Sequence, residues 1–342
     1  MKKLKLGLIF GGKSEEHDIS IISAKSIYDN LDKNKYDIFS YYIDKTGIWS
    51  SVDSPYNLHN CDKISQSFFP FKNIKPIIEK VELFFPILHG KYGEDGTIQG
   101  IFEFENIPFV GSGTLGSSIG MNKIISKKIL ESEGIPVVDY ININIKEIHG
   151  LNEQELINSI AEGLGFPLFV KPSNSGSSFG ITKVEKPEAI YPALQKAAKY
   201  SDNILIEEAI DAREIECAVF SNKKEIKASI LGEIIPFNDF YDYEDKYVLN
   251  KTEFDVPASI EPNLSERIRK IAIETFKALN QYGMARVDFL IDKNNNEIFV
   301  NEINSIPGFT SISMYPRLWK ETGWDFPELL DKLIESGLMR YE

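Results

Sequence analysis

The chain has 342 residues, a formal net charge of −13 at pH 7, 42% hydrophobic residues and 26% charged residues. This length and composition are typical of a globular protein with two or three domains and a large core. The acidic charge argues against a nucleic-acid surface, whose footprint is basic, and no apolar run reaches membrane-spanning length. The first residues lack the long apolar segment of a secretion signal, so we expect a cytoplasmic protein.

The first 31 residues have the pattern of a strand, a glycine turn and a helix. Residues 4–10 are apolar, Gly11-Gly12 follows, and an amphipathic run covers residues 21–31. This is not a dinucleotide fingerprint, because the third glycine is missing. Glu16 lies just before the expected helix, where a carboxylate either stabilises the helix dipole or holds a substrate ammonium.

A second glycine-rich loop follows the strand expected at residues 81–88. It begins at His89 and contains Gly90, Gly93 and Gly96. In open α/β sheets, ligands bind at the carboxyl ends of the strands, which is where this loop is expected. His89 is therefore either a structural residue or a residue that faces a substrate.

A loop rich in glycine and serine is expected in the middle of the chain. A helix is first predicted from residue 115 to residue 133, and it contains Lys123. Further on, a strand that ends at Lys171 leads into the small residues of segment 172–180. Such a loop presents backbone N–H groups to a phosphate, and the lysine adds a positive charge. The alternative is a hairpin tip that binds nothing.

Acidic side chains end the next apolar strand, which is expected at residues 203–210. Glu207 and Glu208 belong to it, and Glu214 follows. Carboxylates and backbone groups at such a place can read the adenine edge and the ribose hydroxyls of a nucleotide. The aromatic and charged segment 240–247 has the composition of a lid rather than of a core element.

Two neighbouring strands near the C-terminus, separated by a turn at residues 292–296, concentrate polar side chains. Alternation places Arg286 and Asp288 on one face of the first strand, and Glu302 and Asn304 on one face of the second. If the two faces coincide, three oxygen-bearing side chains suit Mg²⁺, and the arginine suits an anion that gains charge during a reaction. The alternative is the solvated side of an ordinary sheet.

Five motifs, taken in order, resemble those of the D-alanine–D-alanine ligases, members of the ATP-grasp superfamily. The motifs are Gly-Gly-Lys-Ser-Glu-Glu-His-Asp-Ile-Ser at 11–20, His-Gly-x-x-Gly-Glu-Asp-Gly at 89–96, Lys-Pro-x-x-x-Gly-Ser-Ser-x-Gly at 171–180, Phe-Tyr-Asp-Tyr-Glu-Asp-Lys-Tyr at 240–247 and Asn-Glu-Ile-Asn-Ser-Ile-Pro-Gly-Phe-Thr-Ser at 301–311. The resemblance runs from Gly11 to Tyr315, nearly the whole chain. Glu208 and Ile312 depart from the commonest family pattern, which has a lysine and a histidine there.

The resemblance implies an α/β fold with α+β elements and three ATP-grasp domains. The N-terminal substrate-binding domain, residues 1–111, is expected to have an open parallel sheet. A small central α+β subdomain is expected at residues 112–205. The C-terminal catalytic subdomain, residues 206–342, is expected to be mainly antiparallel and to carry a lid loop at residues 236–252.

The resemblance also implies a site with ATP as co-substrate, two Mg²⁺ ions, for which Mn²⁺ can substitute, and D-alanine. The implied ATP-binding residues are Lys123, Lys171, Ser177, Ser178, Glu207, Glu208, Ile210, Glu214, Phe240 and Lys246. The implied metal ligands are Asp288, Glu302 and Asn304. The implied substrate-binding residues are Glu16, His89, Ser313 and Met314. The implied catalytic residues are Glu16, Ser177, Arg286, Gly308, Lys246 and Tyr247.

The implied reaction supports peptidoglycan precursor synthesis and has two steps. The carboxylate of the first D-alanine attacks the γ-phosphorus of ATP, which gives an acyl phosphate and ADP. The amine of the second D-alanine then attacks the acyl carbon, and the oxyanion faces Arg286 and the backbone N–H of Gly308. Tyr247, the departing phosphate and water are all candidates for accepting the proton of the incoming amine.

Two alternatives stay open at this point. D-serine is the main alternative second substrate; Lys246 and Tyr247 resemble the dipeptide-forming members, and the apolar Met314 favours D-alanine. A non-catalytic ATP-binding protein is the alternative from another class, and the intact Arg286 with its three oxygen-bearing neighbours argues against it. The resemblance further suggests a homodimer formed through the N-terminal domain.

Overall fold

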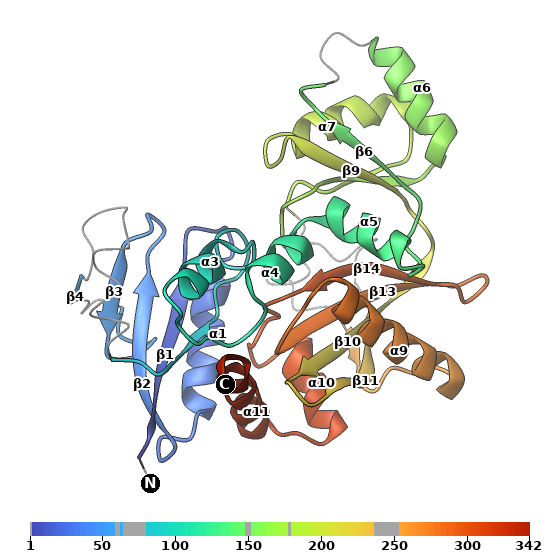
Figure 1. Ribbon diagram of the computed structural model, residues 1–342. Helices are drawn as coiled ribbons and strands as arrows, with labels where there is room; N and C mark the ends of the chain where they lie inside the picture. The colour runs from blue at the N-terminus through green and yellow to red at the C-terminus, as the bar shows by residue number, and fades with distance from the viewer. Residues whose placement is uncertain (1, 59–61, 64–79, 148–151, 177–178, 236–252) are drawn as a thin grey trace.

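The computed structural model describes residues 2–58, 62–63, 80–147, 152–176, 179–235 and 253–342. These residues form three sheets, which follow one another along the chain and are covered by helices (Figure 1). Within them, no helix combines the length and the apolar character needed to cross a bilayer.

The first sheet has five strands in the order β4-β3-β2-β1-β5. Its strands are β1 (Leu4–Gly11), β2 (Tyr36–Ile43), β3 (Trp49–Val52), β4 (Asp62–Lys63) and β5 (Leu83–Pro86). Strand β1 pairs in parallel with β2 and β5, whereas β3 and β4 are antiparallel additions at one edge. The expected parallel sheet is therefore present in the three strands β2, β1 and β5. Strand β1 at its centre is apolar and mostly buried, as is typical of a parallel strand. Helices α1 (His17–Asn30) and α3 (Thr97–Phe104) follow β1 and β5.

The second sheet is antiparallel and has the order β6-β9-β7-β8. Its strands are β6 (Tyr140–Asn144), β7 (Leu168–Pro172), β8 (Thr182–Val184) and β9 (Asn203–Glu208). Helices α6 (Glu153–Leu164) and α7 (Ile190–Ala197), with a short 3₁₀ turn at Pro187–Ala189, bury their apolar sides against it. This small α+β unit holds Lys171 and Glu207 on neighbouring strands.

The third sheet is antiparallel and has the order β12-β11-β10-β13-β14. Its strands are β10 (Ala212–Ser221), β11 (Ile226–Ile235), β12 (Glu253–Asp255), β13 (Met284–Asp292) and β14 (Ile298–Asn304). Helix α9 (Pro262–Ala278) packs Ile268 and Phe276 against Val287 and Phe289 of β13. Because strand residues alternate between faces, Arg286 and Asp288, which alternate with these two apolar residues, point away from α9. The core on one face thus fixes which side chains line the other.

The last two helices join the first and third sheets into one core. Helices α10 (Met314–Thr322) and α11 (Phe326–Tyr341) place Tyr315 and Leu330 in the same buried cluster as Leu6 and Phe85 of the first sheet. The ribbon shows α11 lying between these two regions (Figure 1). The loops that follow β1 and β5 are therefore held on the same body as the third sheet.

The single helix predicted at residues 115–133 is wrong, because the structure has two helices there. They are α4 (Thr114–Met121) and α5 (Lys123–Ser132), separated by Asn122. Asn122 is extended, at φ −92° and ψ 96°, and its side chain accepts a hydrogen bond from the backbone N–H of Ile125. It is the N-cap of a new helix, a role that asparagine favours. Lys123 is consequently the first residue of α5 rather than a mid-helix residue.

Candidate functional site

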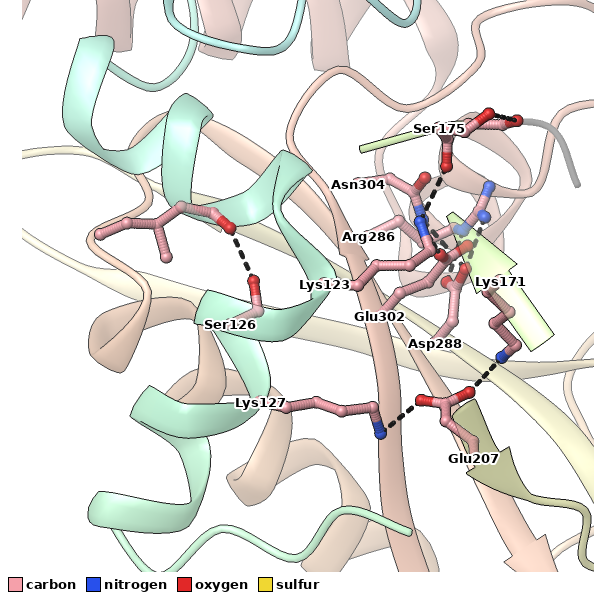
Figure 2. Close-up of polar contacts among 12 residues, drawn as sticks. Lys123, Ser126, Lys127, Lys171, Ser175, Glu207, Arg286, Asp288, Glu302 and Asn304 are labelled. Carbon is pink, nitrogen blue, oxygen red and sulfur yellow. Dashed lines mark hydrogen bonds and ion pairs between the residues drawn. The ribbon is translucent and has the colours of Figure 1, made fainter. Parts of the chain in front are cut away.

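The four polar residues predicted on the C-terminal hairpin lie together on one face. Arg286 pairs with Asn304, and Asp288 with Glu302, as directly opposite residues of β13 and β14. Arg286 donates from Nε and Nη2 to the two carboxylate oxygens of Asp288, at 2.7 Å each. Asn304 Nδ2 donates to Asp288 Oδ2 at 2.9 Å, as Figure 2 shows. Directly opposite strand residues are close neighbours, so the register itself assembles this group.

A further carboxylate, that of Glu216, also lies against Arg286. It lies on β10 opposite Asp288, is 4% exposed, and places Oε2 3.1 Å from Arg286 Nε. Burial lowers the pKa of Arg286, but Asp288 and Glu216 more than offset this and raise the pKa well above its usual value. Sequence reasoning missed Glu216. Its signal is the strand alternation that places it on the same face as Glu214.

Lys123 connects the hairpin to the loop rich in glycine and serine. Its Nζ lies 3.0 Å from Glu302 Oε2 and donates to the carbonyl oxygen of Ser175 at 3.0 Å. Its backbone N–H donates to the carbonyl oxygen of Ser173. Burial lowers the pKa of Lys123, but the charge of Glu302 outweighs burial and the pKa is raised. The lysine is therefore charged, and it faces both the metal candidates and the candidate phosphate loop.

The donor set of the hairpin fits magnesium with help from a substrate. Asp288 and Glu302 offer carboxylate oxygens and Asn304 an amide oxygen, and neither β13 nor β14 contains a cysteine or a histidine. Among the described residues, no three histidine, cysteine or acidic side chains are grouped to hold a metal by themselves. Mg²⁺ characteristically takes one or two carboxylates and completes its shell with water and substrate phosphates. This chemistry matches the oxygens present.

A buried ion cluster lies beside the hairpin. Glu207 on β9 is contacted by Lys127 of α5, at 2.7 Å between Nζ and Oε1, and by Lys171 of β7 (Figure 2). Burial raises the pKa of Glu207, but the two ammonium groups outweigh it and lower the pKa to about 2. Sequence reasoning predicted Lys171 and Glu207 as site residues but missed Lys127. The signal for Lys127 is its position one helical turn after Lys123.

Two adjoining cavities contain the predicted residues of the described part of the chain. The larger, about 700 Å³, has the size of a small-molecule site. Its walls include the predicted nucleotide residues Lys123, Lys171, Glu207, Glu208, Ile210 and Glu214. The smaller cavity is lined by Glu16, His89, Gly308, Ser313 and Met314. Lys123, Arg286 and Glu302 line both cavities, so this is where two ligands would meet.

Glu16 lies where three segments of the chain converge on the smaller cavity. A Cβ atom on Gly90 would lie 2.4 Å from its Oε2, and one on Gly176 would lie 2.7 Å from the same atom. Both distances are too short for a side chain, so glycine at these two positions permits the close approach. The carboxylate therefore touches the His89 loop and the loop rich in glycine and serine at once.

His89 is a buried, neutral residue of the cavity wall. Its Nδ1 lies 3.0 Å from the carbonyl oxygen of Ile306 and must donate, so Nε2 accepts from the hydroxyl of Ser23 at 3.0 Å. Burial lowers the pKa of His89 despite the nearby charge of Glu16. Both ring nitrogens are thus engaged with protein groups. His89 lies beside the cavity, but it also fixes the turn that precedes Gly308.

Glu94 is a second carboxylate that sequence reasoning did not single out, although it belongs to the His89 motif. It accepts from the backbone N–H groups of Gly90 and Ile306, each at 2.9 Å. Burial, with the charge of Glu16, raises the pKa of Glu94 to about 7. It therefore ties the His89 loop to the turn after β14.

Residues at the start of α10 form the end of the smaller cavity. Ser313 is the N-cap residue of α10, and its Oγ accepts from the backbone N–H of Thr310 at 3.0 Å. A helix N-terminus favours a carboxylate ligand. Met314 is 3% exposed and belongs mainly to the core, while Ile312 is 42% exposed on the cavity side. A Cβ on Gly308 would lie 2.6 Å from Ser313 Oγ, so glycine keeps this turn close to the helix.

Several predicted residues lie outside the described part of the chain. They are Ser177, Ser178, Phe240, Lys246, Tyr247 and the proposed lid loop 236–252. Their roles stay predictions from the resemblance.

Comparison with known proteins agrees with this geometry. A family model described as D-ala D-ala ligase N-terminus matches residues 5–112, and one described as D-ala D-ala ligase C-terminus matches residues 129–335. A D-alanine–D-alanine ligase of Clostridium acetobutylicum is 45% identical, over 99% of each chain. One of Acetivibrio thermocellus is 43% identical, over 99% of this chain and 97% of that relative.

Two solved ligase structures are also similar to this chain. The D-alanine-D-alanine ligase from Coxiella burnetii superimposes with a TM-score of 0.84 at 35% identity, covering 100% of this chain and 95% of that one. A D-Ala:D-Ser ligase from Enterococcus faecalis has the same TM-score and identity, covering 98% and 100%.

The three sheets around two adjoining cavities have the ATP-grasp architecture. More narrowly, the chain belongs to the D-alanine–D-alanine ligase family.

Proposed function

We propose that this protein is an ADP-forming ligase that uses ATP to join two D-alanine molecules into D-alanyl-D-alanine through an acyl phosphate. The observation that carries the proposal is the pair of cavities that share Lys123, Arg286 and Glu302. A nucleotide in the larger cavity and a small amino acid in the smaller one would bring the γ-phosphate to the amino acid carboxylate. Holding two reacting groups next to each other in this way lowers the activation free energy of their reaction.

ATP is assigned to the larger cavity. Lys171 and Lys123 face the phosphates, while Glu207, Glu208, Ile210 and Glu214 surround the adenine and the ribose. Ser177 and Ser178 in the loop, and Phe240 and Lys246 on the lid, complete the assignment from the family resemblance. Cations around a transferring phosphoryl group stabilise the charge that it carries.

Asp288, Glu302 and Asn304 would hold two Mg²⁺ ions, with Mn²⁺ as a substitute. When bound, such ions neutralise the charge of the transferred phosphoryl group. The structure supports this assignment through the oxygen chemistry of the three side chains and their common face on β13 and β14. Lys123 and Arg286 face three carboxylates, those of Asp288, Glu302 and Glu216, so this group keeps one net negative charge, which favours a bound cation.

The two amino acids are assigned to the smaller cavity. Glu16 holds the ammonium of the first D-alanine, beside His89, and Ser313 with the N-terminus of α10 holds the carboxylate of the second, beside Met314. Arg286 and the backbone N–H of Gly308 stabilise the oxyanion that forms when the second amine attacks. Tyr247 and Lys246 on the lid, together with Ser177, close the site and keep water from the acyl phosphate.

Release of phosphate from ATP tests the function. With Mg²⁺ present, phosphate release should require D-alanine and should match the amount of D-alanyl-D-alanine formed. A protein that binds ATP without turning it over in the presence of D-alanine would contradict the proposal. Much faster turnover with mixed D-alanine and D-serine than with D-alanine alone would reassign the second substrate to D-serine.

Three broader assignments rest on the resemblance. The assigned domain boundary at 111/112 lies between the first and second sheets, whereas the one at 205/206 falls within β9 (Asn203–Glu208), which belongs to the second sheet. The protein is assigned to the cytoplasm and to peptidoglycan precursor synthesis. A homodimer through residues 1–111 is the assigned assembly, and sedimentation of the purified protein tests it.

A further inference from the structure

Lys127 is a buried cation that the reaction assigned above does not use. Its side chain is 2% exposed, whereas that of Lys171, on the other side of Glu207, is 13% exposed and lines the larger cavity. Figure 2 shows the three side chains in a line, with Glu207 between the two lysines. Lys171 can therefore reach a ligand in the larger cavity, whereas Lys127 cannot.

Helix α5 holds Lys127 firmly in place. One side of the helix packs Leu130 into the core of the third sheet. The adjoining part of the same helix face meets the second sheet, where Lys127 Nζ lies 5.6 Å from the ring centroid of Tyr140. Glu131, one turn further on, accepts from the hydroxyl of Tyr140 at 2.6 Å, and Tyr140 is the strand partner of Glu207. The ammonium is thus fixed between a carboxylate and an aromatic face.

The charges of Lys127, Glu207 and Lys171 suggest what the buried lysine contributes. The cluster has two positive charges and one negative charge, so it presents one net positive charge to the larger cavity. If Glu207 had Lys171 as its sole partner, moving Lys171 to a phosphate would leave a buried carboxylate without a counter-charge, which is costly. With Lys127 behind it, Glu207 stays neutralised when Lys171 turns to the phosphates.

We propose that Lys127 is a positioning residue for nucleotide binding: it neutralises Glu207 permanently and so frees Lys171 to contact the phosphates of ATP. The inference rests on the proposed function for the identity of the ligand. The proposed effect of Lys127 differs from a general attraction between its positive charge and a phosphate, because it depends on Glu207. If Glu207 is removed, Lys127 should therefore no longer affect the affinity for ATP.

The test is a double-mutant cycle with Lys127→Met and Glu207→Gln. Lys127→Met alone should raise the KM for ATP by at least about tenfold, while kcat and the KM for D-alanine change less than about twofold. In the Glu207→Gln background, adding Lys127→Met should change the KM for ATP by less than about twofold. Lys127→Arg, which keeps the charge, should restore most of the affinity, and Lys128→Met, at the exposed neighbouring position, is the matched control.

Thermal unfolding supplies a second readout. Glu207→Gln leaves Lys127 buried without a counter-charge, so the double variant should melt at a higher temperature than Glu207→Gln alone. Equal losses of ATP affinity on Lys127→Met in both backgrounds would overturn the proposal and indicate simple charge attraction. So would an unchanged KM for ATP in the single variant.

Calorimetric titration with a non-hydrolysable ATP analogue separates this inference from the proposed function. If the wild-type protein releases no phosphate with D-alanine, the function fails, but the cycle is still measured as affinity for the analogue. Binding of the analogue with the same non-additive pattern supports the role of Lys127. Binding that is equal in wild type and Lys127→Met contradicts it.

Discussion

Two charged clusters lie side by side at this site, and they differ in exposure and in origin (Figure 2). In the hairpin cluster, Arg286 is 17% exposed and lines both cavities, and Asp288 is 13% exposed and lines the larger one. The cluster around Glu207 is assembled from α5, β7 and β9; Lys127 and Glu207 are 2% and 3% exposed, and only Lys171, at 13%, reaches the larger cavity. Groups that meet the reacting atoms must be reachable, whereas groups that hold geometry are best buried. We therefore expect the hairpin cluster to control kcat and the Glu207 cluster to control ATP affinity and stability.

The largest effect is expected from Arg286→Met. This change removes the donor assigned to the oxyanion, so kcat should fall roughly 100- to 1000-fold, as when other oxyanion donors are removed. Arg267→Met on the exposed side of α9 is the matched control and should retain full activity. Unchanged kcat in Arg286→Met would remove the hairpin cluster from the chemistry.

A comparable but smaller loss is expected from Glu302→Gln. The change keeps the shape and removes one charge of the proposed metal site, so phosphoryl transfer should fall about 100-fold. Glu297→Gln, at an exposed position at the start of the same strand region, is the control. If Glu302→Gln altered only nucleotide affinity, the hairpin would be a binding feature rather than a catalytic one.

The Glu207 cluster should show its effect in stability. Glu207→Gln leaves Lys127 unpaired and should lower the free energy of unfolding at pH 7 by roughly 3 kcal/mol. The pKa of Glu207 in the folded protein, about 2, lies below its ordinary value of 4.5. Its contribution is therefore present above about pH 4.5 and is lost as the pH falls toward 2. Urea unfolding at several pH values measures this, and a difference that grows on acidification would contradict the account.

Glu94 should show the opposite pH dependence and the smallest effect. Its pKa of about 7 lies above the ordinary 4.5, so its ionisation costs stability as the pH rises from about 4.5 to about 7. Glu94→Gln removes this cost but keeps one acceptor for the two backbone N–H groups, so we expect a gain of about 1 kcal/mol at pH 8. The same urea unfolding should show the gain vanish near pH 5. A gain that is independent of pH would mean that Glu94 is not the titrating group.

The same difference in origin explains how much of the site the sequence could predict. Arg286, Asp288, Glu302 and Asn304 lie on two consecutive strands, so alternation predicted that each pair shares a face, and the strand register shows that the two faces coincide. The three sheets followed from apolar strand patterns and from the family resemblance. By contrast, the ion pair of Lys127 with Glu207 joins residues that are far apart in the chain, and no local pattern reveals such a contact.

Local polar residues were the other source of error. The apolar spacing is helical on both sides of Asn122, so it predicted one continuous helix. The hydrogen bond that the Asn122 side chain accepts from Ile125 instead caps a second helix there. Glu94 and Glu216 are carboxylates in segments that already carried other acidic residues. Their importance comes from burial against Ile306 and Arg286, which only the folded chain shows.

The most direct test of the central claim is to follow oxygen from D-alanine into phosphate. D-alanine labelled with ¹⁸O in its carboxylate is incubated with the protein, ATP and Mg²⁺, and the released phosphate is analysed by mass spectrometry. Attack of the carboxylate on the γ-phosphorus, at the junction of the two cavities, predicts one ¹⁸O atom in each phosphate released. Formation of dipeptide with unlabelled phosphate would contradict the acyl phosphate route and the meeting of the two ligands at Arg286 and Glu302.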